Sequence, residues 1–330
     1  MQMLRSQTES MVTLNEVQAA RTLLRGVTVR TPLVECRLPD KRRIFIKPEN
    51  LQPVGSFKLR GAYNKIASLT AEEKARGVVA HSSGNHAQGV AFAARALGVK
   101  AVIVMPRNAP EVKLEATRSF GAEIVLVGPA SEDRISKAEE LEKERGLVAV
   151  PPYNDEKIIA GQGTIGLEIL DDLGDVEVVL APVGGGGLIS GIATAIKESR
   201  PGVKIIGVEP EFAADARESL RTGKIQFTLA ENAAKTLADG LRSQSVGPIN
   251  FEHIRKYVDA IIAVKENEIK QAMRQLLFAG RILAEPSGAV TTAAAMFHAN
   301  EIPASDRTVA VVSGGNIEPQ LFTDILTGRI

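Results

Sequence analysis

The chain lacks the sequence features on which disulfide bonds, metal clusters and membrane spans depend. Cys36 is the single cysteine among 330 residues, which excludes an internal disulfide and a cluster of thiolate ligands. The four histidines do not have the spacing of a metal site. No apolar run is long enough to cross a membrane, and the polar start MQMLRSQTES lacks the apolar segment of a signal peptide. We therefore expect a cytoplasmic protein with no membrane attachment.

The chain also lacks an excess of charge of either sign. It has 40 lysines and arginines against 39 aspartates and glutamates, so the formal net charge is +1. This balance gives no reason to expect a nucleic-acid partner or a strongly charged one. Apolar residues make up 44% of the sequence, which is ordinary for a globular protein, and the length is sufficient for two domains.

Three consecutive segments, residues 77–98, 99–121 and 122–146, share one pattern. Each begins with a short apolar run, passes through a polar turn into a helical pattern, and ends at a glycine. A glycine is the usual stop after a helix, and short apolar runs that alternate with helical patterns indicate strand–helix units of a parallel sheet. We therefore predict a parallel sheet for this part of the chain.

A second region repeats the pattern on both sides of the first. Further strands, glycine turns and helices are expected at residues 43–50, 176–199, 203–210, 266–282 and 308–316. The predicted fold class is α/β with two domains, each a mostly parallel twisted sheet flanked by helices, and with a ligand site in the cleft between them. We place the large domain at residues 1–76 plus 154–330 and a small mobile domain at residues 77–153.

Four consecutive glycines, Gly184 to Gly187, open the expected helix in APVGGGGLISGIA. Glycines let backbone N–H groups converge on an anion, and the helix N-terminus adds its dipole, so this turn predicts a phosphate site. A mere tight turn rarely uses four glycines. The dinucleotide fingerprint fails here because Ser190 stands where its third glycine belongs, and the Gly-Lys-Ser/Thr ending of a nucleotide-triphosphate loop is missing. A phosphate monoester fits better, but Glu209 after the strand at 203–210 keeps a dinucleotide-binding module open as an alternative.

Two other turns carry polar groups at the ends of expected strands. In HSSGNHAQG, Ser82, Ser83 and Asn85 precede a helix whose N-terminus could hold a carboxylate. The alternative is that a serine only caps this helix. In VVSGGN, Ser313 could make one hydrogen bond at the end of a buried strand.

Lys58 lies between Phe57 and Leu59 in ENLQPVGSFKLRGA, where a loop becomes a helix. Apolar surroundings disfavour the ammonium form of a lysine and make it a better nucleophile. A lysine, a phosphate turn and a carboxylate-binding turn together are the parts of a pyridoxal 5′-phosphate site. The lysine would form the Schiff base with the aldehyde, the glycines would bind the phosphate, and the serine-rich turn would bind the carboxylate of an amino acid.

Five separate motifs now point to one family. The segments SFKLRGA, SSGNHAQGVA, AGQGTIGLEI, PVGGGGLISGIA and SGGN resemble, in order, those of the serine/threonine dehydratase and serine racemase family, within the tryptophan synthase β-subunit fold of pyridoxal phosphate enzymes. The resemblance extends from about Val12 to the end of the chain. It implies roles for the cofactor-binding residues: Lys58 as the Schiff-base lysine, Phe57 against the cofactor, Asn85 at its phenolic oxygen, Gly184, Gly185, Gly186, Gly187 and Leu188 at the phosphate, Ser313 at the pyridine nitrogen, and Glu285 lining the pocket.

The resemblance also implies a substrate pocket. The residues expected to line it are Ser82, Ser83, Gly84, Asn85, His86 and Tyr153. Ser83 stands where serine racemases place a second acid/base on the face opposite the lysine, whereas His86 is expected to be a packed turn residue and not a catalyst. Asn154 replaces an acid that follows the tyrosine in threonine dehydratases, which bears on substrate preference.

A divalent-cation site is implied by the same resemblance. Glu209, the carbonyl of Ala213 and Asp215 match the spacing of a site found in part of the family. Hard oxygen ligands suit Mg²⁺, Ca²⁺ or Mn²⁺. The alternative is that both carboxylates are simply solvated after a strand.

These features predict a pyridoxal phosphate-dependent ammonia-lyase, a homodimer or higher homo-oligomer, that converts serine or threonine to a 2-oxo acid and ammonia. A neutral serine at the ring nitrogen makes a weaker electron sink than an aspartate does, which favours β-elimination over transamination. Amino-acid racemisation, dehydration of another β-hydroxy amino acid such as hydroxyaspartate, and a non-catalytic nucleotide-binding module stay open as alternatives. The chain ends soon after SGGN, so we expect no regulatory region of the kind that longer threonine dehydratases carry.

Overall fold

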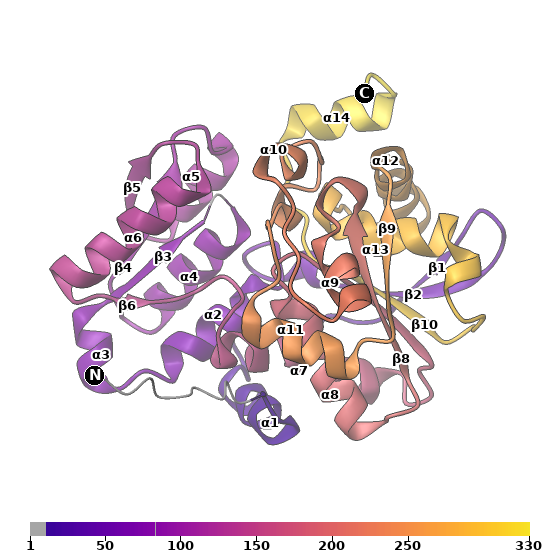
Figure 1. The fold of residues 1–330 in the computed structure, drawn as a ribbon, viewed down its shortest axis with the longest axis horizontal. Helices are drawn as coiled ribbons and strands as arrows, with labels where there is room; N and C mark the ends of the chain where they lie inside the picture. The colour runs from indigo at the N-terminus through magenta and orange to yellow at the C-terminus, as the bar shows by residue number, and fades with distance from the viewer. Residues whose placement is uncertain (1–10, 83) are drawn as a thin grey trace.

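Two β-sheets organise the chain, as the computed structural model shows for residues 11–82 and 84–330 (Figure 1). The larger has six strands in the order β1-β2-β10-β7-β8-β9. Strand β1 pairs with β2 in antiparallel fashion, and the other pairs are parallel. Its strands are β1 (Val34–Arg37), β2 (Arg43–Pro48), β7 (Val178–Pro182), β8 (Lys204–Pro210), β9 (Ala260–Val264) and β10 (Thr308–Val312).

The central strands of this sheet are buried on both faces. In β7, Val178 and Leu180 join one apolar cluster, whereas Val179 and Ala181 join another on the opposite face. This alternation follows from the two-residue period of a strand, and it explains why β7 reads as a continuous apolar run. The first cluster is covered by α12 (Glu266–Gln275) and α13 (Pro286–Phe297), and the second by α7 (Glu156–Asp172), α8 (Gly187–Ser199) and α11 (Pro248–Tyr257).

The smaller sheet has four parallel strands in the order β5-β4-β3-β6. Helix α6 (Ser131–Arg145) covers one face, and α2 (Lys58–Ala67) and α4 (Asn85–Ala96) contribute to the core on the other face. The strands are β3 (Val78–His81), β4 (Ala101–Pro106), β5 (Glu123–Val127) and β6 (Val148–Ala149).

Shorter elements complete the described chain. The remaining α-helices are α1 (Leu14–Leu23), α3 (Ala71–Arg76), α5 (Glu111–Ser119), α9 (Asp215–Thr222), α10 (Ala230–Ala233) and α14 (Pro319–Thr327). The 3₁₀ turns are η1 (Glu49–Leu51), η2 (Glu211–Ala213), η3 (Asp239–Leu241) and η5 (Ala299–Glu301), and the π-helical segment η4 (Leu276–Gly280) follows α12. In the described part of the chain no helix has both the length and the apolar character needed to cross a bilayer.

The predicted fold class is confirmed: both sheets are mostly parallel and flanked by helices. Helix α2 lies between the two sheets in Figure 1, and its Leu59, Ala62 and Ile66 pack into the core of the smaller one. The sequence boundaries at residues 76 and 154 place this helix with the larger sheet, and this division into domains stays a prediction.

Candidate active site

Three polar turns lie at the carboxyl ends of parallel strands, where α/β proteins bind their ligands. Gly84 and Asn85 follow β3, the glycines of residues 184–187 follow β7, and Ser313 follows β10. Gly84 is the N-cap of α4 and Gly186 the N-cap of α8, and neither provides a side chain that could accept a hydrogen bond from the first turn. The N–H groups at these helix starts are therefore suited to an anion.

The loop before Lys58 is attached to the turn after β10. The backbone N–H of Phe57 donates to the carbonyl of Ser313 at 3.1 Å, and the N–H of Gly315 donates to the carbonyl of Gly55 at 2.9 Å. Gly55 has φ +69°, and a Cβ at this position would lie 2.3 Å from Oδ1 of Asn316. Only glycine fits there, and these bonds hold Lys58 near Ser313 at the start of α2.

The Lys58 ammonium is enclosed although part of its side chain reaches solvent. Burial lowers the pKa of Lys58 to about 8. Its Nζ donates to the carbonyl of Pro152 at 2.6 Å and lies 5.2 Å from the centre of the Phe57 ring. The amine is thus more readily deprotonated than an exposed one, as the sequence predicts for a nucleophilic lysine.

Helix α7 supports both the lysine and the glycine turn. It packs closely against α2 and α8, and a Cβ at Gly161 would lie 2.6 Å from the carbonyl oxygen of Arg60 on α2. At Gly163 an added Cβ would lie 2.9 Å from the carbonyl oxygen of Gly191 on α8. The glycines of AGQGTIGLEI therefore allow the backbones of these helices to approach one another.

Tyr153 lies against the glycine turn. A Cβ at Gly185 would be 2.2 Å from Cδ1 of Tyr153, so any larger residue would displace the ring. Burial, together with the charge of Asp215, raises the pKa of Tyr153. Its neighbour Asn154, the departure from the family pattern, accepts a hydrogen bond from the N–H of Ile249 at 3.0 Å and so holds this loop against α11.

Asn85 and Glu285 form a polar wall beside Gly314, in the turn after β10. Nδ2 of Asn85 donates to Oε1 of Glu285 at 2.5 Å, and Oδ1 of Asn85 accepts from Asn316 at 2.8 Å. Glu285 is 1% exposed, and its Oε2 has no hydrogen-bond partner among the described residues. Burial raises the pKa of Glu285 to about 7 even though Lys113 opposes the shift.

The structure places the remaining predicted site residues in different surroundings. Oγ of Ser82 accepts from the N–H of Gly84 at 3.1 Å, and the buried Ser313 donates to the carbonyl of Ser287 at 3.4 Å. His86 is buried, with Nε2 2.8 Å from the carbonyl oxygen of Val150, and burial followed by the Lys58 charge lowers the pKa of His86 to about 3. The His86 ring is thus neutral and packed, and the role expected of it stays a prediction. Leu188 is buried in the first turn of α8, and Ser83 lies outside the described residues.

The predicted cation ligands follow β8. Both oxygens of Glu209 accept backbone hydrogen bonds, from Ala216 at 3.0 Å and Arg217 at 2.9 Å. Oδ2 of Asp215 is buried without a hydrogen-bond partner in the described chain. Ala213, two positions earlier in the sequence, is also buried. Burial raises the pKa of both carboxyl groups, that of Asp215 to about 7, and the charge of Asp215 contributes to the shift at Glu209. Within residues 11–82 and 84–330 no three acidic, histidine or cysteine side chains gather as a metal cluster, so a cation here would depend on carbonyl or water ligands as well.

Sequence reasoning missed several residues that shape the site. Pro152 accepts a hydrogen bond from the Lys58 ammonium, and Asn316 links the wall to the loop before Lys58. Lys113 on α5 reaches Asp239 and Glu285. Asn316 belongs to the quoted SGGN motif and could have been assigned, whereas nothing in the local sequence distinguishes Lys113 from a surface lysine.

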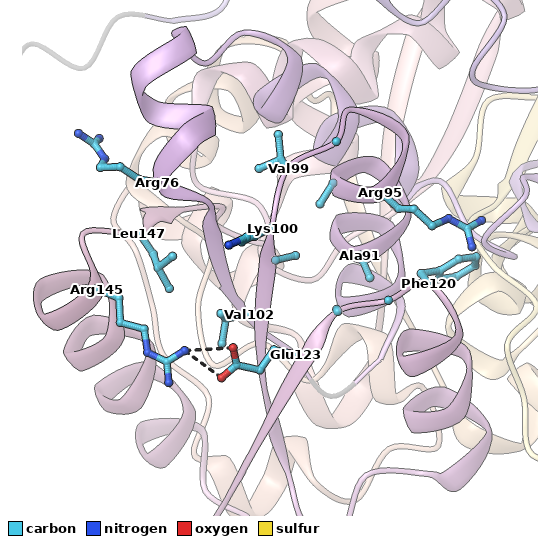
Figure 2. Close-up of a pocket in the computed structure, with 15 residues that line it drawn as sticks. Arg76, Ala91, Arg95, Val99, Lys100, Val102, Phe120, Glu123, Arg145 and Leu147 are labelled. Carbon is cyan, nitrogen blue, oxygen red and sulfur yellow. Dashed lines mark hydrogen bonds and ion pairs between the residues drawn. The ribbon is translucent and has the colours of Figure 1, made fainter.

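A cavity of about 610 Å³ lies elsewhere, at the amino ends of strands β4 and β5 of the smaller sheet (Figure 2). It contains none of the predicted site residues. Arg145 pairs with Glu123 there, and Arg95 lies over the rings of Phe92 and Phe120. The cavity lacks both Lys58 and the glycine turn of residues 184–187.

Comparison with known proteins identifies the family of the chain. The family model described as pyridoxal-phosphate dependent enzyme matches residues 24–314, so the chain belongs to this family. The chain is 46% identical over 320 residues to the L-threonine ammonia-lyase of Thermotoga maritima, a match that covers 96% of this chain and 78% of that one. The predicted family resemblance and the predicted cofactor are confirmed.

Solved structures show the same fold. The processed form of threonine deaminase isoform 2 from Solanum lycopersicum superimposes with a TM-score of 0.86 at 36% identity, and the match covers 97% of this chain and 91% of that one. Maize serine racemase superimposes with a TM-score of 0.90 at 34% identity, covering 97% and 98% of the two chains.

The residues of the site fit pyridoxal phosphate. Lys58 can attach the aldehyde, and the helix start at Gly187 can hold the phosphate through N–H groups that no side chain caps. Ser313 provides a buried hydroxyl whose bond to Ser287 is long, at 3.4 Å, and Asn85 provides an amide that Glu285 holds in place.

Proposed function

We propose that the protein is a pyridoxal phosphate-dependent L-threonine ammonia-lyase, with L-serine as a second substrate. The reaction removes the α-proton and the β-hydroxyl of threonine as water, and the product then takes up water to give 2-oxobutanoate and ammonia. The observation that carries the proposal is that the glycine turn and Asn85 follow the parallel strands β7 and β3 while Lys58 is tied to the turn after β10, in a chain 46% identical to an L-threonine ammonia-lyase.

Lys58 would act twice. Its lowered pKa, about 8, leaves a larger share of neutral amine than an exposed lysine has near neutral pH, which suits attachment of the cofactor aldehyde. When bound, pyridoxal phosphate supplies an electron sink for the charge left at the α-carbon. Freed by the incoming amino acid, Nζ can accept the α-proton and hold it next to the Pro152 carbonyl.

The other residues of the site would bind the cofactor and orient the substrate. The N–H groups from Gly184 to Leu188 would bind the phosphate at the N-terminus of α8, and Ser313 would meet the ring nitrogen with a neutral hydroxyl. Asn85 would meet the phenolic oxygen while Glu285 fixes its amide. The turn from Ser82 to His86 and Tyr153 would surround the substrate, and Ser83 remains the predicted acid/base on the opposite face.

We also propose that Glu209, Asp215 and the carbonyl of Ala213 bind Mg²⁺, Ca²⁺ or Mn²⁺. The unpaired, buried Oδ2 of Asp215 supports this, because a buried carboxylate oxygen without a donor is costly unless a cation or a proton compensates it. The cation would hold the loop after β8 beside Tyr153, whose pKa the Asp215 charge already affects.

We further propose that residues 77–153 move as a small domain, and that the enzyme is a cytoplasmic homo-oligomer. The separate four-stranded sheet supports the first point. The single cysteine, buried and unpaired, fits a reducing compartment.

A substrate panel tests the activity. The purified enzyme with pyridoxal phosphate is incubated with the L- and D-isomers of threonine and serine and with β-hydroxyaspartate, and 2-oxo acid, ammonia and the opposite enantiomer are measured. We expect L-threonine to give the highest kcat/KM, with 2-oxobutanoate and ammonia in equal amounts. Formation of the opposite enantiomer without ammonia would make the protein a racemase and contradict the proposal.

A further inference from the structure

Lys113 is a buried cation that links the part of the chain around the four-stranded sheet to the part around the six-stranded sheet. It lies in the first turn of α5, on the side of the four-stranded sheet, and is only 4% exposed. Its Nζ lies 2.5 Å from Oδ2 of Asp239 in η3 and 3.8 Å from Oε2 of Glu285 before α13. Both carboxylates belong to the side of the six-stranded sheet.

Both partners of Lys113 touch the candidate active site. Glu285 accepts the amide of Asn85, and Lys113 is the cation that faces its other oxygen. The turn η3 lies beside the glycines, since a Cβ at Gly184 would be 3.2 Å from Cα of Leu241. Lys113 therefore contacts the wall around Asn85 and the turn next to the phosphate site at the same time.

The stem of Lys113 also lies against the serine-rich turn. A Cβ at Gly84 would be 3.1 Å from Cδ of Lys113 and 3.3 Å from Nζ. A side chain at residue 84 would push the lysine away from Asp239, so the glycine and the lysine positions depend on each other. The turn expected to bind the substrate carboxylate is thus backed by the same side chain.

The carboxylates around Lys113 stabilise its ammonium form. Burial disfavours its ammonium, but the carboxylates of Glu285 and Asp239 outweigh burial and the repulsion from Arg242, so the pKa of Lys113 is raised. The side chain of Asp239 is 31% exposed, against 5% for that of Lys113. Because water reaches one partner, the pair is weaker than a fully buried one, and separating it leaves Asp239 solvated.

We propose that Lys113 is a positioning residue for the lyase reaction, whose ion pair with Asp239 holds the four-stranded part of the chain over the site while its ammonium faces Glu285. The inference rests on the proposed function, because it assigns Lys113 to the closed state in which the amino acid reacts. Lys113 acts here through Gly84, Asp239 and Glu285, and contact with the reacting atoms is not required.

The test compares Lys113→Met, Asp239→Asn and the double variant, all with pyridoxal phosphate bound. Arg118→Met is the matched control, because Arg118 lies on the same helix and pairs with Glu115 at the surface. For L-threonine we measure kcat and KM, and on the same samples we measure hydrogen exchange of residues 84–89 and 237–243. Lys113→Arg preserves the charge and serves as the conservative variant.

We expect Lys113→Met and Asp239→Asn each to lower kcat/KM at least about tenfold, because the first removes the cation that faces Glu285 and Asp239 and the second removes the closer of the two carboxylates that hold Lys113. Most of this loss in kcat/KM should appear as a higher KM, because the closed state holds the substrate. The kcat/KM of the double variant should be no lower than that of the worse single variant. Hydrogen exchange of residues 84–89 and 237–243 should be faster in both single variants. Lys113→Arg should keep more activity than Lys113→Met. Arg118→Met should stay within about twofold of the parent, because an exposed pair contributes little.

Three results would overturn the inference. The first is a kcat/KM of Lys113→Met equal to that of the parent, and the second is a double variant in which the losses of the two single variants add. The third is a kcat/KM of Asp239→Asn equal to that of the parent while Lys113→Met is inactive, which would make Lys113 a direct ligand of the substrate or cofactor. If Lys113→Met does not fold, Asp239→Asn and Lys113→Arg still decide between these outcomes. A parent that releases no ammonia from L-threonine contradicts the proposed function instead, and the exchange comparison then tests the ion pair by itself.

Discussion

The chemistry of Lys58 depends on what surrounds its amine. The enclosed position at the start of α2 lowers its pKa to about 8, and the bonds from Gly55 and Phe57 to the turn after β10 fix its place beside Ser313. Two predictions follow from this arrangement, one for replacement of the Lys58 side chain and one for the pH at which its amine loses a proton.

Replacing Lys58 with alanine should remove the covalent link to the cofactor and almost all turnover of L-threonine. The residue is both the attachment point and the proposed proton acceptor, so at least about two orders of magnitude in rate should be lost. The visible absorption of the lysine-bound cofactor and its trapping by borohydride report the link, and circular dichroism serves as the check on folding. Near-normal turnover by a folded variant would contradict the assignment of Lys58 as attachment point and proton acceptor.

The rate at which the apoprotein takes up pyridoxal phosphate should rise with pH and level off above about pH 8, because only the neutral amine attacks an aldehyde and the pKa of Lys58 is about 8. An ordinary lysine, with a pKa of 10.5, would show a rise that continues for more than two further pH units. Between these two values the unfolded chain binds the extra proton, so the apoprotein should also become more stable as pH increases through this window. Stopped-flow absorbance at a series of pH values measures the first effect, and a profile still climbing at pH 10 would contradict it.

At the scale of elements, the strand–turn–helix units around the site were the predictable part. The apolar runs at β3, β7 and β10 alternate with turns whose glycines and serines have a local meaning, and the structure places strands and helices there as expected. The strands β1, β6 and β9 were not predicted, because β1 and β6 are short and β9 has no glycine turn after it. The role of the glycines in α7 also needed the structure, since they are explained by α2 and α8, which are distant in sequence.

A buried ion network ties these elements together. Arg60 on α2 binds Oε2 of Glu49 in η1 at 2.7 Å and Oε1 of Glu168 on α7 at 2.7 Å, and Lys47 on β2 also binds Glu168 at 2.7 Å. Lys47, Glu49 and Arg60 are fully buried, and the carboxylates of Glu49 and Glu168 outweigh burial and raise the pKa of Arg60. The network fixes α2, and with it Lys58, against β2 and α7.

Arg60→Met should therefore destabilise the fold by about 3–5 kcal/mol, because Glu49 and Glu168 would be left buried with one counter-charge fewer. Arg30→Met is the matched control: Arg30 pairs with Asp172 across the surface, and its loss should cost at most about 1 kcal/mol. Urea denaturation followed by circular dichroism measures both. Equal stabilities of the two variants would mean that the network contributes nothing beyond a surface pair.

At the scale of the whole molecule, the arrangement of the two sheets could not be read from local patterns. Lys113 and Asp239 are 126 positions apart, and Asn85 and Glu285 are 200 apart, so their contacts depend on how the sheets pack. Periodicity detects a strand or a helix but says nothing about which strand lies beside which. The family motifs could locate Lys58, Asn85 and the glycines because each carries its own turn chemistry, whereas a lone lysine in α5 carries none.

The proposed cation site is best tested through the stability of the whole chain. If Mg²⁺, Ca²⁺ or Mn²⁺ binds at Asp215, it replaces the missing partner of a buried carboxylate oxygen and stabilises the native state by mass action. The melting temperature of the parent should rise with the logarithm of cation concentration above the dissociation constant, with about 2.7 kcal/mol gained at a hundredfold excess over that constant.

Asp215→Asn should lose this response and keep its cofactor absorption, because the residue begins α9 and does not belong to the glycine turn. Glu211→Gln is the matched control: Glu211 is an exposed carboxylate in η2, between β8 and α9, so its variant should respond to the cation as the parent does. A chelator should lower the melting temperature and the L-threonine activity of the parent together, and excess Mg²⁺ should restore both. Zinc should be a poor substitute, because it prefers nitrogen and sulfur ligands that this loop does not offer. If the parent, Asp215→Asn and Glu211→Gln all melt at temperatures that neither chelator nor cation changes, then the buried carboxyl groups of Glu209 and Asp215 are compensated by protons, as their raised pKa values indicate, and not by a metal.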